Sequence, residues 1–235
     1  RAEYATVAEA LACGARGASP PLPHSLNIAQ TIDTARAGTG LSAMQLSEVG
    51  AACVALRQLA RWGASAREHS PRLARAAQRA DPPERLLASL GDAFEPTTDA
   101  DARLSSESFP KLGRRREKAT AREKAVRAAC DSLLSDGAYR ARLSGPSARW
   151  RAGRLVVAAP AGRAEVLGPV VSRSRSGATA FVEPKPLVPL SAAARAAEAA
   201  RERAERRYLR ALAALVARHA PALEAALDAA GIVDG

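Results

Sequence analysis

Few residues of this 235-residue chain have the types and spacing that catalysis or metal binding requires. The three histidines, His24, His69 and His219, lie far apart, with no cysteine or carboxylate at metal-ligand spacing. None of the four lysines follows a glycine and precedes a serine or threonine, so the sequence contains no Walker-type phosphate-binding loop. We therefore expect the chain to be non-catalytic, with no metal site and no cofactor of its own.

Positive charge is concentrated in one stretch of the sequence. The whole chain has a formal net charge of +11, but residues 111–210 alone hold 23 basic and 9 acidic side chains. Clustered cations favour a polyanion partner, because their binding to phosphates releases counterions. The alternative is an ordinary solvated helix surface in an arginine-rich chain.

Two short clusters of arginine are candidates for contact with such a partner. Arg114, Arg115 and Arg116 lie near the start of a predicted helix, where positive charge opposes the helix dipole. Arg173 and Arg175 lie in a predicted bend. We expect these five side chains to contact phosphate groups of a nucleic acid.

The segment 171–184, with the sequence VSRSRSGATAFVEP, predicts a strand, a turn and a second strand. Gly177 permits the positive φ of a turn, and Glu183-Pro184 ends the second strand. In a functional interpretation, the hydroxyl groups and arginines of the bend bind phosphate. In the alternative interpretation, the hydroxyl groups satisfy the amides of the turn, which is the commoner role of such residues.

The elements that must position these residues are mostly helices, because alanine is abundant and aromatic residues make up only 3% of the chain. In the first part, helices are predicted over 1–17, 24–37, 42–62, 71–79 and 82–90. Ser42 and Gln45 predict a capping box, and Gly63 predicts the end of that helix. Residues 91–110 predict a loop.

The second part predicts a helix over 111–136 that ends at Gly137, then a small antiparallel β unit near 154–183. Its strands are expected at 155–157, 166–171 and 180–182. Ser191 is expected to cap a long final helix, which from 191 to 219 would measure about 43 Å. The predicted fold class is therefore mainly α, with a small β unit and a lever-like C-terminal helix.

Cysteine count and hydropathy argue against two further protein classes. Three distant cysteines, Cys13, Cys53 and Cys130, do not suit a secreted disulfide scaffold. No apolar run approaches 18 residues and no signal peptide is visible, so neither a membrane partner nor export is expected.

The stretch 176–184, SGATAFVEP, followed by a long charged helix, resembles the MutS family of DNA mismatch-recognition ATPases. It is most similar to the MutS-two branch, which suppresses recombination and carries a C-terminal Smr nuclease domain. The matching signature residues are Ser176, Gly177, Thr179, Phe181, Glu183 and Pro184. Gly40-Leu41-Ser42 and the run from Asp101 to Arg116 also fit the family's order of elements, so the resemblance covers about residues 24–230.

The resemblance implies a helical core over 1–143, a small β insert over 144–190, and a lever helix over 191–235 that leads towards an ATPase domain absent from this sequence. The family dimerises and holds DNA between paired levers. The parent protein is thus expected to bind double-stranded or branched DNA as a homodimer, with ATP and Mg²⁺. It would act in mismatch repair or recombination control as an ATPase, with an Smr-type endonuclease as a further activity.

Other functions stay open at this point. The same charge pattern suits a helical adaptor that binds RNA or a ribosome, and relatives of this branch are linked to ribosome rescue. A purely structural helical scaffold, in which the arginines serve only solubility, is the third possibility. The expected location is intracellular, in either a bacterial cytoplasm or a plant or algal organelle such as the chloroplast.

Overall fold

The computed structural model describes residues 9, 19–21, 28–95 and 102–234. The chain forms two compact units, one comprising Arg1–Phe109 with Glu205–Gly235 and the other Pro110–Ala204. The described residues are mainly helical and include one four-stranded antiparallel sheet, which confirms the predicted fold class at that level. The final helix contributes to both units, because the division falls within it, after Ala204.

The first unit contains short helices, two of which pack on one longer helix. Its described helices are α2 (Ala29–Arg36), α3 (Ala43–Ser65), α4 (Pro71–Arg79) and α5 (Glu84–Leu90), together with the second part of α9 (Val188–Asp234). Both α4 and α5 pack on α3. The predicted capping box is confirmed, because the Gln45 amide donates to the Ser42 hydroxyl and the Ser42 amide donates to the Gln45 side chain. The helix predicted over 1–17 lies almost entirely outside the described residues.

Gly63 does not end α3, so this prediction is wrong. The helix continues to Ser65. A Cβ atom on residue 63 would lie 2.7 Å from the Cβ atom of Ala77, on the neighbouring helix α4. The glycine is therefore needed for the close approach of α3 and α4, and the sequence alone does not distinguish this role from a helix end.

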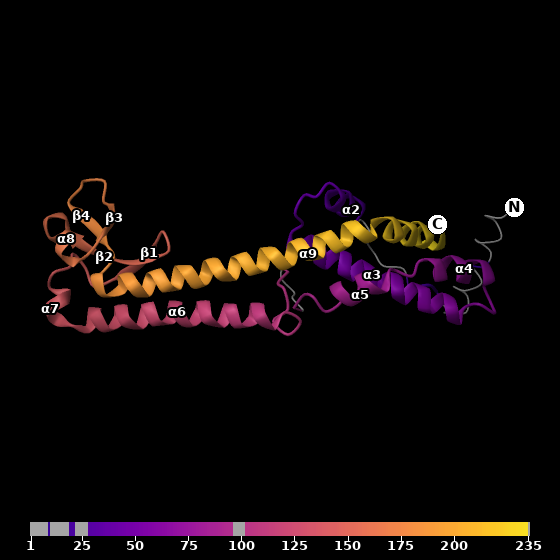
Figure 1. Cartoon of the computed structure of the whole chain (residues 1–235), viewed down its shortest axis with the longest axis horizontal. Helices are drawn as coiled ribbons and strands as arrows, with labels where there is room; N and C mark the ends of the chain where they lie inside the picture. Colours follow the sequence, from indigo (N-terminus) through magenta and orange to yellow (C-terminus); the bar gives the residue numbers. More distant parts are fainter. Residues whose placement is uncertain (1–8, 10–18, 22–27, 96–101, 235) are drawn as a thin grey trace. The chain divides into compact units, whose positions relative to one another are not determined.

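The second unit joins two helices through a small sheet. In Figure 1, α6 (Pro110–Ser135) and the first part of α9 run in opposite directions. The elements that connect them in the sequence are α7 (Gly137–Arg140), β1 (Ala148–Arg151), β2 (Arg154–Pro160), η1 (Ala161–Arg163), α8 (Ala164–Leu167), β3 (Val170–Arg173), β4 (Thr179–Val182) and η2 (Lys185–Leu187). The strand order is β1-β2-β4-β3, and all neighbours are antiparallel.

The strands agree only in part with the prediction. The predicted strands at 155–157 and 180–182 lie within β2 and β4. The strand predicted over 166–171 is wrong in its first half, where α8 forms instead and the Gly168 amide donates to the Ala164 carbonyl. Gly137, which was predicted only to end the helix before it, is the first residue of α7. β1 was not predicted at all.

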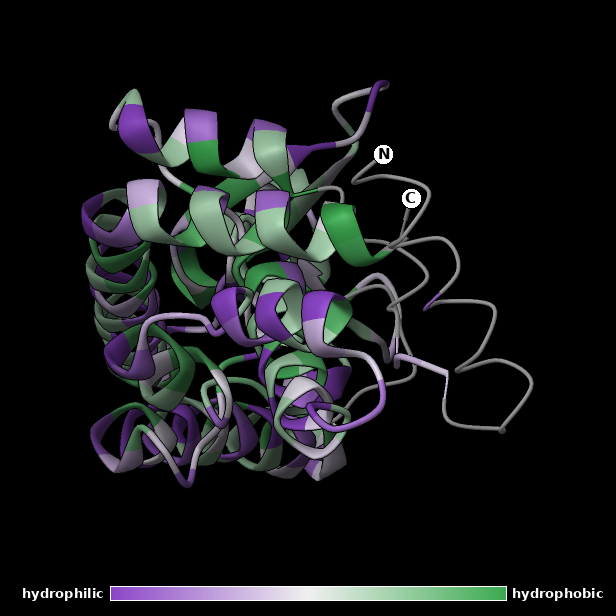
Figure 2. Cartoon of the chain, turned by 90° about the vertical axis from the view of Figure 1, so that its right-hand side faces the viewer, coloured by the Kyte–Doolittle hydropathy of each residue, from purple (hydrophilic) through white to green (hydrophobic). Residues whose placement is uncertain are grey.

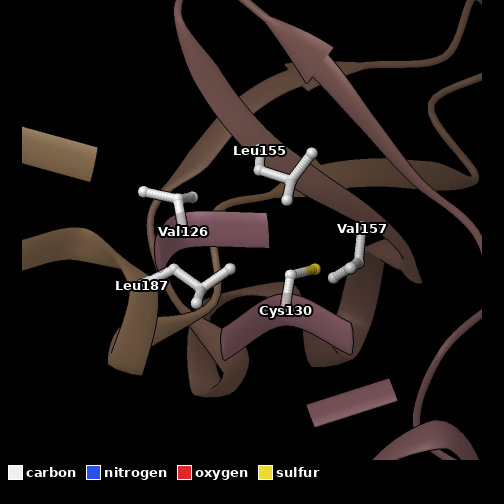
Figure 3. Close-up of a cluster of buried hydrophobic side chains, with 5 residues drawn as sticks. All are labelled: Val126, Cys130, Leu155, Val157 and Leu187. Carbon is white, nitrogen blue, oxygen red and sulfur yellow. The ribbon is translucent and has the colours of Figure 1, made fainter. Parts of the chain in front are cut away.

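One face of the sheet packs against the helices. Figure 3 shows Val126 and Cys130 of α6, Leu155 and Val157 of β2, and Leu187 of η2 converging in one buried cluster. Two further side chains of α9, those of Leu190 and Ala194, pack against it. This cluster fixes the sheet to the end of α6 and to the start of α9.

The final helix begins earlier than predicted. α9 starts at Val188, so Ser191 lies inside the helix and is fully buried instead of capping it. Pro189 is tolerated in the first turn, because amides there have no partner within a helix. The helix continues through Pro221 to Asp234, which confirms the predicted long C-terminal helix.

The helices carry both polar and apolar residues. Figure 2 shows hydrophilic and hydrophobic residues mixed along them. Within the described ranges, none of the helices combines the length and the apolar character that crossing a bilayer requires.

The two described cysteines are expected to be unreactive in the folded chain. Burial raises the pKa of the Cys53 thiol to about 12 and that of Cys130 to about 11, where Asp131 adds to the effect. Because the thiolate is the nucleophile, neither should react with Ellman's reagent near pH 8 until the chain unfolds. We expect thiol release to follow the urea unfolding curve in a Cys13→Ser variant, and rapid reaction of the native protein would contradict the burial.

The same shifts predict a loss of stability at alkaline pH. When folding raises the pKa of a thiol, the stability that the protonated thiol contributes is complete below its pKa in the unfolded chain, near 9.0. For Cys130 this stability is lost as the pH rises from there towards its folded pKa of about 11. The midpoint of urea unfolding should therefore fall over this range, and less so in a Cys130→Ala variant relative to its own value at neutral pH.

Candidate nucleic-acid interface

The second unit carries the positive charge of the chain. Residues 110–204 hold 20 basic and 8 acidic side chains, a net charge of +12. Residues 1–109 and 205–235 together hold 15 basic and 16 acidic side chains, a net charge of −1. The cations that the sequence analysis singled out therefore belong to one compact unit.

One side of α6 is a row of cations, which we call the α6 stripe. Its members are Lys111, Arg114, Arg115, Lys118 and Arg122, and all five are exposed. Residues 111, 115, 118 and 122 recur at the spacing of neighbours on one helix face. In the described part of the chain, none of the five forms an ion pair. The stripe thus presents uncompensated charge to solvent.

Arg116 differs from the two arginines that precede it. It lies four residues after Leu112 and three before Ala119, which are both buried, and its own side chain is half-buried. It also makes an interaction within the protein. Of the predicted cluster, Arg114 and Arg115 are the members exposed on the stripe.

Arg173 and Arg175 lie at the turn between β3 and β4, and both side chains are exposed. The Thr179 amide donates to the Ser174 hydroxyl at 3.1 Å, and the Gly177 amide donates to the Ser174 carbonyl at 3.0 Å. The hydroxyl therefore satisfies a turn amide, as the alternative interpretation of this segment expected. The two guanidinium groups form no ion pair within the described ranges, so they can meet an external anion.

The signature residues mostly build the sheet. Gly177 has φ 75°, which the turn requires, and Thr179 begins β4. Glu183 is only 1% exposed; its Oε2 lies 3.4 Å from Arg154 Nη1 and its Oε1 lies 4.0 Å from Arg195 Nη1. The remaining members are Ser176, which is exposed, Phe181, which is half-buried, and Pro184, which is buried.

The predicted arginines fall into two separate groups on the second unit. α6 meets the sheet at Val126 and Cys130, which follow Arg115 along the helix axis by about 17 Å and about 23 Å. The structure therefore does not bring the α6 stripe and the β3–β4 turn into one pocket. A polyanion that contacts both must be extended, over about five to seven base pairs at roughly 3.4 Å each.

No protein-family model matches the chain, and no curated protein is significantly similar to it. Within the described ranges, there is no group of three or more histidine, cysteine or acidic side chains that could hold a metal ion.

Sequence reasoning missed Arg149 and Arg151, which are exposed on β1. β1 and β2 are joined by Ala152 and Gly153, with φ 47° and 67°, the pattern of a type I′ hairpin turn. The available signal was the alternation in the sequence ARWR before this turn. The exposed positions of β1 are charged and the strand is short, so the hydrophobic pattern of this segment is weak.

Proposed function

We propose that the second unit binds nucleic acid and that double-stranded or branched DNA is its partner. The observation that carries this proposal is a unit of net charge +12 with two separate groups of exposed arginines, which form no ion pair with any residue that the structure describes. A small anion reaches only one group. An extended polyphosphate reaches both, and each neutralised phosphate releases counterions.

The wider proposal is that the chain is the core and lever segment of a MutS-two-like protein. Its support is the signature over 176–184 and the long helix α9 that follows. The parent would then form a homodimer, use ATP and Mg²⁺ bound outside this chain, and act in mismatch repair or recombination control. We propose an intracellular location for it, in a bacterial cytoplasm or an organelle.

The test is the salt dependence of DNA binding by the whole chain, followed by fluorescence anisotropy. We expect weak binding to a duplex of about 20 base pairs, with an affinity that falls steeply between about 50 and 200 mM salt. A hairpin duplex of about four base pairs is too short to span the two groups, so it should bind at least about tenfold more weakly. Binding that ignores salt, or no binding at about 50 mM salt, would overturn the proposal.

Competition separates this function from the alternatives. Ribosomal RNA that displaces the duplex at much lower concentration than unlabelled duplex would favour an RNA-binding or ribosome-binding adaptor. Failure of every polyanion to bind would favour a structural scaffold whose arginines serve solubility.

A further inference from the structure

The sheet of the second unit has a second face, opposite to the one that carries Leu155 and Val157 of the buried cluster in Figure 3. Strand pairing identifies its members. Arg149 pairs with Val156, and Ala158, two residues along β2, pairs with Phe181. Arg151, two residues after Arg149, shares this face because side chains alternate along a strand. We call this side the outer face.

The centre of the outer face is a stacked pair. The Cζ atom of Arg151 lies over the Phe181 ring, 3.9 Å from its centroid, and Arg151 Nη1 donates to the Ser172 hydroxyl at 3.4 Å. Arg151 is nevertheless an exposed residue. We therefore expect the side of its guanidinium turned away from the ring to be accessible to a ligand. These two contacts order a long side chain before any ligand binds, which lowers the entropic cost of binding.

A guanidinium held in this way suits an unpaired base. Unstacked bases stack on guanidinium planes as they do on aromatic rings. A base inside a duplex is already stacked on its neighbours on both sides, so it cannot stack on the Arg151 guanidinium. Only the phosphates of a duplex can contact this side chain.

Positive charge also lies beside the stacked pair. Arg149 shares the outer face on β1, and Arg175 lies in the turn that follows β3. Both are exposed, and within the described ranges neither has an acidic partner. Arg173 pairs with the buried Ala180, so its side chain lies on the opposite face of the sheet. Arg149 and Arg175 are therefore placed to contact the phosphates on either side of a nucleotide at Arg151.

We infer that the outer face binds an unpaired segment of DNA, with one base stacked on Arg151 and the adjacent phosphates at Arg149 and Arg175. This inference rests on the proposed DNA-binding function and adds the feature recognised in a branched or gapped substrate. The duplex arm of such a substrate would lie along the α6 stripe, and its single strand would lie on the sheet.

The test compares the whole chain with an Arg151→Lys variant, which keeps the charge but loses the guanidinium plane. Three ligands are used: oligo(dT) of about ten nucleotides, an abasic strand of equal length, and a duplex of about 20 base pairs. We expect Arg151→Lys to bind oligo(dT) about tenfold more weakly, and to bind the other two within about twofold of wild type. Arg163→Lys, at an exposed arginine of η1 in the same unit, is the matched control and should leave all three unchanged.

Each other outcome overturns the inference in a distinct way. Equal weakening for all three ligands would show that Arg151 acts only as a charge, and unchanged oligo(dT) binding would show that no base stacks there. Tighter binding of an oligo(U) RNA than of oligo(dT) would replace DNA by RNA as the occupant. Failure of the wild-type chain to bind the duplex would instead refute the proposed function, so the two failures are distinguishable.

Discussion

Replacing Gly168 by alanine is expected to disrupt the sheet of the second unit and to lower the free energy of unfolding by about 3 kcal/mol or more. A Cβ atom at this position would lie 2.0 Å from the Glu183 carbonyl oxygen and 3.1 Å from the Lys185 amide nitrogen. These are backbone atoms, and the Glu183 amide is held by the Pro169 carbonyl at 3.0 Å. The clash therefore cannot be relieved by rotating a side chain.

Urea unfolding followed by tryptophan fluorescence measures this effect. Trp150 packs against the cluster of Figure 3, so a Trp62→Phe background reports on the second unit alone. Gly162→Ala is the matched control, because its Cβ atom meets nothing within 4 Å, and its stability should change by no more than about 0.5 kcal/mol. A Gly168→Ala protein as stable as this control would refute the close approach of the two segments.

Local signals predicted the parts of the fold that depend on neighbours in sequence. The Ser42–Gln45 capping box and the helix over 71–79 are examples, since each is decided within a few residues. The structural roles of the glycines, by contrast, could not be decided from their neighbours in sequence. Gly63 permits helix packing and Gly168 permits contact with the chain after β4, and both reasons depend on residues that lie distant in the sequence.

The candidate interface likewise has features that the sequence predicts and features that depend on tertiary packing. Clustered charge is visible in the sequence, whereas the face on which each arginine lies depends on packing, as the contrast between exposed Arg115 and half-buried Arg116 shows. The stacking of Arg151 on Phe181 could not be predicted, because the two residues meet only through the strand order β1-β2-β4-β3.

Replacing the four exposed predicted arginines, Arg114, Arg115, Arg173 and Arg175, by glutamine is expected to abolish most DNA binding. If each contacts one phosphate, the slope of log affinity against log salt should become shallower by about 3 to 4. At about 100 mM salt, the affinity for a duplex of about 20 base pairs should fall by about a hundredfold or more. Anisotropy titrations over a range of salt concentrations measure both quantities.

A second quadruple variant separates this interface from net charge alone. Arg61, Arg75, Arg79 and Arg85 are exposed arginines of the first unit, and their replacement by glutamine removes the same charge. This control should bind within about threefold of wild type, because its charges do not lie against the DNA phosphates and are screened over about 10 Å at 0.1 M salt.

The pairs Arg114/Arg115 and Arg173/Arg175, replaced separately, should each account for about half of the slope change. If one pair accounts for all of it, the duplex does not extend along α6 to the sheet, and equal weakening by both quadruple variants would reduce the interface to a general effect of charge.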